Sequence, residues 1–240
     1  MKLLLLAAVI LTGCYGSKQM TVNPSLANTE RWTASLEEGR HMIGTAAFGP
    51  YRTIHTRKLS DSTDTKNVSG KIFVKPRSIH YVRKEYSLLL AGQDTSLTHF
   101  FVAYSWEQEE RSLLDLFTKS EVDRTRHMER KTGYGTITVN NITWNFYLGG
   151  LDEDYVIEAR LERNGDTLST VEVFSFVNQT ANKDSKGITL INKKGKHLGA
   201  LQLIGKRYVW ISADLDLDLR LAIASFFAVI LSVKKLESSA

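Results

Sequence analysis

The side chains of this chain that could do chemistry are scattered, and their spacing favours no metal site. None of the six histidines forms an HxH or HExxH motif or stands at a Cys/His ligand spacing. Three alternate aspartates, Asp214, Asp216 and Asp218, have the spacing of the first ligands in a calcium loop. An EF-hand also needs a glycine and a distal glutamate, which are missing here, and the intervening leucines are too apolar for an open loop. We therefore expect no metal. The aspartates should end a strand and point outward, with Asp218 capping a helix.

Motifs of nucleophilic or nucleotide chemistry are missing from the sequence as well. It contains no G-x-S-x-G elbow, no G-x-G-x-x-G and no phosphate-binding loop. The acidic run of residues 152–154 follows two glycines and could pair carboxylates, but it is more typical of a solvated hairpin loop. We expect no catalytic residue and no cofactor. Because catalytic residues need not be adjacent in sequence, a hydrolase of envelope material stays open as an alternative.

Two basic clusters are better candidates for a binding surface. The first contains Arg124, Arg126, Arg130 and Lys131. The second combines cations with tyrosines and consists of Lys75, Arg77, Tyr81, Arg83, Lys84 and Tyr86. Beside a membrane, each such cation is worth about 1 kcal/mol of attraction to anionic headgroups. Acidic residues dilute the first cluster, so a solvated, salt-bridged face is the simpler interpretation.

The only cysteine, Cys14, closes an N-terminal leader in which Lys2 precedes an apolar run of residues 3–11. This run is much shorter than the roughly 20 residues of a spanning helix and is typical of a secretory signal. The residues LTGC at 11–14 resemble the lipobox of bacterial lipoproteins. The resemblance implies that residues 1–13 are a signal peptide cleaved between Gly13 and Cys14. It also implies diacylglycerol on the sulfur and acylation of the new amine.

Lipidation would give this single thiol a role, whereas the alternative is an ordinary secretory signal with an incidental cysteine. Acyl chains hold a protein at a membrane surface without a spanning helix. Tyr15 follows the cysteine where aspartate could stand, which in lipoproteins implies the outer membrane. No acidic cluster follows Cys14, so we expect a periplasm-facing anchor. Residues 14–30 are rich in Ser, Thr, Asn and Gln, so we expect the lipidated cysteine to be followed by a flexible tether.

The remainder, residues 31–240, has the composition of one folded domain. The chain of 240 residues is 42% hydrophobic and 24% charged, which excludes disordered and fibrous classes. Its net charge of +5 arises from cations interleaved with acids, so we expect no nucleic-acid partner.

Short runs of β-branched and aromatic residues, separated by turn signals, predict many strands. The expected strands are 42–48, 51–58, 71–74, 78–91, 98–105, 136–139, 142–148, 155–162, 167–177, 188–192, 199–204 and 208–213. Asn140-Asn141 and Asn164-Gly165 have the residues of tight hairpins, and Lys194-Gly195 and Gly205-Lys206 are weaker copies. These turns predict an antiparallel meander. The charged stretch 107–131 should interrupt it with a short helix and a solvated excursion.

The C-terminal segment predicts a helix over residues 218–235 whose stretch Leu221–Val233 carries no charge. At 1.5 Å per residue this stretch is about 20 Å long, which is too short to cross a hydrocarbon core comfortably. A helix that is apolar all round must be buried all round. Its small residues fall on one arc, and the large residues that would fill a core include Leu221, Ile223, Phe226, Phe227, Val229, Ile230 and Val233.

The sequence contains many hairpin signals, followed by GKRYVWISADLDLDL and then by LRLAIASFFAVILSV. This order resembles that of the C-terminal domains of tubby-like proteins, which include LURP-one and scramblase relatives. The resemblance implies an antiparallel β-barrel threaded by its C-terminal helix. Neither the phosphoinositide-binding residues nor the calcium segment of those relatives has a matching position here. Only the fold is therefore carried over.

Together these observations predict a mainly β (α+β) protein, an antiparallel β-barrel wrapped around a hydrophobic C-terminal helix. The expected function is that of a membrane-anchored envelope lipoprotein, non-catalytic, which interacts with lipid or with an envelope protein. The alternative fold is a lipocalin-like barrel with a peripheral helix, and its open cavity would carry a hydrophobic small molecule.

Overall fold

A computed structural model describes residues 18–37, 44–68, 77–109, 127–149, 158–177 and 185–238. Within these ranges, the side chains of residues 68, 77, 106–109, 127–131 and 234–238 are not described. The leader, Cys14, the acidic run 152–154 and the expected strand 71–74 lie outside the described residues, so the predictions made for them stay predictions.

The fold is a mainly antiparallel sheet with one long helix, as the sequence predicts. Its strands are β1 (Arg31–Thr33), β2 (Ser35–Glu37), β3 (Thr45–Phe48), β4 (Tyr51–Val68), β5 (Arg77–Ala91), β6 (Thr95–Glu109), β7 (His127–Val139), β8 (Ile142–Gly149), β9 (Glu158–Arg163), β10 (Asp166–Val173), β11 (Gly187–Asn192), β12 (His197–Gln202) and β13 (Tyr208–Ile211). A short helix α1 (Pro24–Ala27) precedes them, and the long helix α3 (Leu217–Ser238) follows.

The thirteen strands form one sheet that is nearly closed into a barrel. From β2 to β13 each strand pairs with the next one along the chain, and β1 pairs with β13. The two ends of the sheet belong to one segment, because β1 and β2 are separated only by Ala34. The backbone N–H of Ala34 donates to the carbonyl of Arg207 at 3.0 Å. Residues 31–37 therefore join the last strand of the meander to its first.

The hairpins form where the turn residues predicted them. Asn140, Asn141 and Asn164 have φ values of 47°, 63° and 48°, and glycines at 165, 195 and 205 are also left-handed. Two successive left-handed residues match the right-handed twist of the paired strands, as a type I′ turn does.

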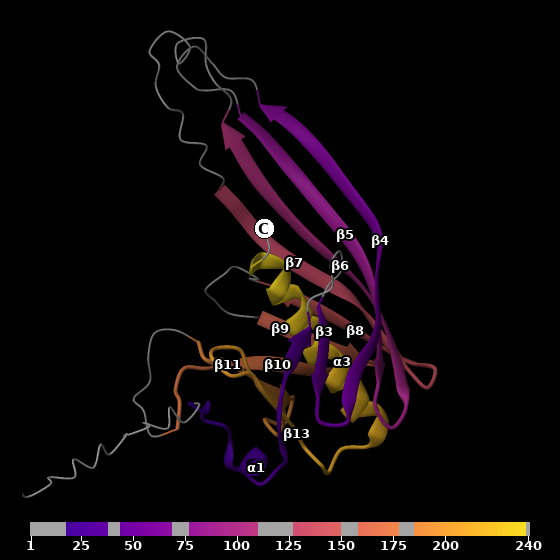
Figure 1. Ribbon diagram of the computed structural model, residues 1–240, viewed down its shortest axis with the longest axis vertical. Coiled ribbons are helices and arrows are strands. Elements are labelled where there is room, and N and C mark those ends of the chain that lie inside the picture. Colours follow the sequence, from indigo (N-terminus) through magenta and orange to yellow (C-terminus); the bar gives the residue numbers. More distant parts are fainter. Residues whose placement is uncertain are drawn as a thin grey trace, which may run out of the picture.

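The connections at the two mouths of the barrel differ in length. At one mouth, which we call the turn mouth, the strands are joined by the short segments 49–50, 92–94, 140–141, 164–165 and 193–196. At the opposite mouth, the loop mouth, the connections are mostly longer. There β4, β5, β6 and β7 extend past the barrel as a long arm (Figure 1).

The helix α3 occupies the barrel interior, which confirms the predicted architecture. All thirteen residues from 221 to 233 are buried, and the large ones named above are at most 3% exposed. The ring of Phe226 meets that of Phe146 from β8 edge-on, with centroids 5.9 Å apart. On another wall, a Cβ at Gly199 of β12 would come within 3.1 Å of the Phe227 ring, so this position accommodates only glycine without a shift. The lipocalin-like alternative is wrong because a helix fills the space where its cavity would be.

The small arc of α3 permits close approach to the strands, as its residue types indicated. Ser225 shares a buried hydrogen bond with Ser96 of β6. Ser232 donates to the backbone carbonyl of Gly44, just before β3, at 3.0 Å. Each serine also bonds to the helix carbonyl four residues earlier, so both hydroxyls are satisfied inside an apolar core.

Residues 18–30 are not part of a free tether, contrary to our expectation. Met20 and Leu26 are fully buried and form a second apolar cluster with Ala200, Tyr208 and Trp210. The backbone N–H of Met20 donates to Oε1 of Gln202 at 2.7 Å. The chain is thus fixed to β12 and β13 from its first described residues, and any tether ends before Lys18.

Two further expectations need correction. Asp216, not Asp218, caps α3, because its Oδ1 accepts the N–H of Leu219 at 2.8 Å and its carbonyl accepts the N–H of Arg220. Asp216 and Asp218 also lie beyond the last strand rather than in it. In the charged stretch 107–131, residues 107–109 and 127–131 continue β6 and β7, while residues 110–126 lie outside the described residues.

Replacing Phe226 by aspartate should abolish folding. Truncation of a buried phenylalanine alone costs about 3–5 kcal/mol, and the variant adds an unpaired buried charge to a protein whose total stability is about 5–15 kcal/mol. Phe174→Asp is the matched control, because Phe174 is 37% exposed. Thermal unfolding followed by circular dichroism checks both variants. An F226D protein that melts at the wild-type temperature would contradict a central α3.

Candidate functional site

The residues predicted to form a binding surface are only partly within the described structure. Arg124 and Arg126 lie outside the described residues. Arg130 and Lys131 belong to β7, but their side chains are not described. The predicted first basic cluster therefore stays a prediction.

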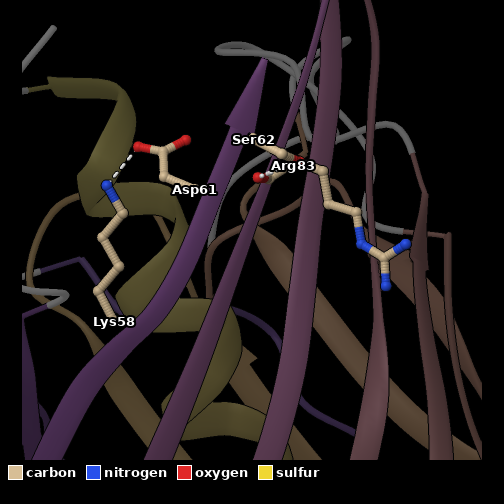
Figure 2. A network of polar contacts seen from close by, with 4 residues as sticks. All are labelled: Lys58, Asp61, Ser62 and Arg83. Atoms are coloured by element: carbon tan, nitrogen blue, oxygen red, sulfur yellow. Dashed lines mark hydrogen bonds and ion pairs between the residues drawn. The ribbon is translucent and has the colours of Figure 1, made fainter. Parts of the chain in front are cut away.

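Lys75 and the side chain of Arg77 lie outside the described structure, and the described cations of the second basic cluster do not form one patch. Arg83 and Lys84 are neighbours in β5, and neighbouring strand residues point to opposite faces. Lys84 is on the face that continues the barrel interior, because it alternates with the buried Tyr86. Lys58 and Asp61 of β4 form an ion pair on the face of the sheet that is turned toward α3 (Figure 2). The Arg83 side chain points away from the opposite face of the sheet (Figure 2). The hydroxyl of Tyr86 lies on the same inner face as Lys84, and its burial raises its pKa to about 12.

On the outer face of the arm, Arg83 packs on aromatic rings. Its guanidinium lies 4.0 Å from the centroid of Phe101, which in turn stacks on Tyr134 at 5.1 Å. A shallow hollow beside it is lined by Asp64, Tyr81, Arg83 and other residues of β4–β7. Cation–π stacking occupies the arginine here, and a carboxylate lies in the same hollow.

The turn mouth is closed by the first turn of α3. Nδ2 of Asn140, from the β7–β8 turn, donates to Oδ1 of Asp218 at 2.8 Å. Tyr51 lies beside Arg220, and burial raises the pKa of its hydroxyl while the guanidinium partly offsets that rise. A hollow of about 160 Å³ lies among these residues. It contains Asp94 and Asp218 together with Arg220, so charges of both signs already meet there.

A larger hollow of about 370 Å³ lies elsewhere at the turn mouth, and we call it the lysine hollow. Its apolar lining comes from β8, β10, β12, the segment before α3 and the first turn of α3: Trp144, Leu168, Leu198, Leu215 and Leu219. Its polar lining consists of Asp166, Thr167, Asn192, Lys193, Lys194 and Lys196. Three cations therefore face one carboxylate over an apolar floor.

The lysines of this hollow stand on a turn that fixes its own backbone. Oδ1 of Asn192 accepts the backbone N–H groups of Lys194 and Lys196 at 3.0 and 2.9 Å. Gly195 supplies the left-handed residue of the turn. Nζ of Lys193 donates to the carbonyl of Gly165 in the neighbouring β9–β10 turn. The turn is thus tied to its neighbour on the same mouth.

Trp144 is the most unusual member of the lysine hollow. It is only 5% exposed, yet its indole Nε1 has no hydrogen-bond partner among the described residues. A buried, unpaired donor costs about 1–3 kcal/mol. The guanidinium of Arg163 lies 5.3 Å from the ring centroid, which adds a fourth cation near the hollow.

Sequence reasoning did not identify this hollow. In the sequence, Lys194-Gly195 indicates only a turn, and Trp144 is one residue of the expected strand 142–148. The hollow forms because the meander brings the β11–β12 turn beside β8 and β10. Residues at alternate positions of those two strands then lie next to the lysines of the turn. No motif in a single stretch of sequence records that juxtaposition.

Within the described ranges, no group of three or more His, Cys, Asp or Glu side chains is arranged to hold a metal ion. In the same part of the chain, no helix has the length and apolar character needed to cross a membrane.

No protein-family model, curated protein or solved structure matches the chain. The lipobox and the tubby-like resemblance therefore stay predictions, while the barrel with its inner helix is established on its own geometry.

Proposed function

We propose that the protein is an envelope lipoprotein, anchored through acyl chains on Cys14 and non-catalytic, which interacts with lipid or with a protein partner at the membrane. We also propose that the barrel is tubby-like, on the support of an apolar C-terminal helix inside an antiparallel meander. The filled interior favours interaction through outer surfaces over transport of a cargo inside the barrel.

The observation that carries this proposal is the short distance along the chain between Cys14 and the barrel. Nε2 of Gln202 donates to the carbonyl of Lys18 at 3.0 Å, so the chain is already held at residue 18. Four residues span at most about 14 Å when fully extended. An acyl anchor on Cys14 would therefore keep the barrel in contact range of the bilayer surface.

The attachment point also favours one orientation. The backbone N–H groups of Thr21 and Val177 exchange hydrogen bonds with the carbonyls of Ser175 and Gln19. Ser175 and Val177 belong to the β10–β11 connection, at the loop mouth. We propose that the loop mouth, from which the arm leaves, faces the membrane, and that the turn mouth faces away.

Cys14→Ser should release the exported protein from the membrane. Full-length protein is produced in a diderm bacterium, membranes are separated, and the intact mass of the membrane-bound form is measured. We expect a mass that lacks residues 1–13 and carries acyl groups, and we expect the C14S variant in the soluble fraction. Ser17→Ala, outside the lipobox, should stay membrane-bound. A C14S protein that stays in the membrane fraction although its mass lacks residues 1–13 would refute the anchor.

The orientation can be measured separately, because acylation blocks the only natural thiol. Single cysteines are introduced at Ile204 of the loop mouth or Ala213 of the turn mouth, which are both exposed, and labelled with a donor dye. Energy transfer to an acceptor lipid in vesicles should be stronger from position 204 than from position 213. Equal or reversed transfer would overturn the orientation and leave the anchor intact.

A further inference from the structure

We propose that the lysine hollow binds a single-chain anionic amphiphile of the fatty-acid class, with its carboxylate at the lysines and its chain over the apolar floor. This inference does not depend on Cys14. It rests on three independent features of the hollow: its floor, its charge and its unpaired donor.

The floor of the hollow is apolar and firmly held. Trp144, Leu168 and Leu198 are at most 5% exposed, and they belong to three different strands. Leu215, just before α3, and Leu219, in its first turn, complete the lining and are partly exposed. Each methylene group that a ligand buries there is removed from water, which favours binding. A hydrocarbon chain therefore complements this floor better than a polar ligand does.

The charge at the hollow selects an anion. Lys193 already donates to a backbone carbonyl, so Lys194 and Lys196 are the cations that we assign to the headgroup. Arg163 lies close by over the Trp144 ring, and Asp166 is the single carboxylate in the lining. An anionic headgroup gains from this excess of positive charge, whereas a cationic one is repelled.

The indole of Trp144 adds a specific donor. Its N–H is buried and has no hydrogen-bond partner among the described residues. A carboxylate oxygen that accepts this N–H would remove the cost of an unpaired buried donor and form a charge-assisted hydrogen bond. Neither of the two other hollows described above, beside Arg83 and beside Arg220, has more cations than carboxylates in its lining.

The size of the hollow limits the ligand to one chain. Its volume of about 370 Å³ lies at the lower end of the roughly 300–1,000 Å³ typical of small-molecule sites. A two-chain phospholipid exceeds such a space, while one acyl chain with a compact headgroup matches it.

The test uses residues 15–240, which lack only the leader and Cys14 and retain both apolar clusters. Tryptophan indoles are labelled with ¹⁵N, the Trp144 signal is assigned with Trp144→Phe, and dodecanoate is titrated in. Dodecanoate should shift the Trp144 indole N–H, while dodecanol and butyrate should bind at least tenfold more weakly. Binding of dodecanol as tight as that of dodecanoate, or dodecanoate binding without a Trp144 shift, would overturn the proposal.

A pair of double variants separates the site from the overall charge. Lys194→Glu with Lys196→Glu should weaken dodecanoate binding by tenfold or more. Lys66→Glu with Lys206→Glu makes the same charge change at exposed lysines outside the hollow and should alter the affinity by less than twofold. Equal losses in both double variants would show general electrostatic attraction and overturn the assigned site. Calorimetry on each folded variant supplies the affinities.

Discussion

The need to bury a helix that is apolar on every face is the constraint on which the rest of this structure depends. Thirteen consecutive residues of α3 are buried, and a single flat sheet could cover only one side of them. The chain satisfies the constraint by winding an antiparallel meander around the helix and closing it with the segment 31–37. Local details follow from the same requirement. Serines on the small arc of α3 reach Ser96 and Gly44, and Gly199 leaves space for the ring of Phe227.

Because α3 fills the barrel interior, the candidate binding surfaces of the barrel lie at its two mouths. At the turn mouth, tight hairpins and the capped start of α3 hold lysines, leucines and a buried indole around one hollow. At the loop mouth, the four-stranded arm extends outward (Figure 1). The N-terminal segment is hydrogen-bonded there to the β10–β11 connection. This division is consistent with a protein whose one end is held at a surface while the other end meets small ligands. Because Leu219 of α3 and Leu215 just before it line the hollow, the helix that fills the core also shapes the candidate site.

Sequence patterns predicted the features that depend on strong local signals. The uncharged stretch 221–233 indicated the central helix, and paired asparagines or Asn-Gly indicated the hairpins. The closing strands β1 and β2 could not be predicted, because three residues are too few to show alternation. Met20 and Leu26 were also missed, since they are isolated apolar residues in a polar stretch and are buried only by tertiary packing against Trp210. Arg83 and Lys84 were grouped by sequence, although strand geometry places them on opposite faces. The lysine hollow combines residues from β8, β10, β11, β12 and α3, which no local pattern reports.

The central claim is that α3 is the innermost element of the fold, and amide hydrogen exchange tests it most directly. If the barrel surrounds α3, the backbone amides of residues 221–233 can exchange only when the whole domain unfolds. They should then be among the slowest in the protein, with an opening free energy equal to that of global unfolding measured in urea. Exchange of these amides through a local opening, well before those of β11 and β12, would contradict the account.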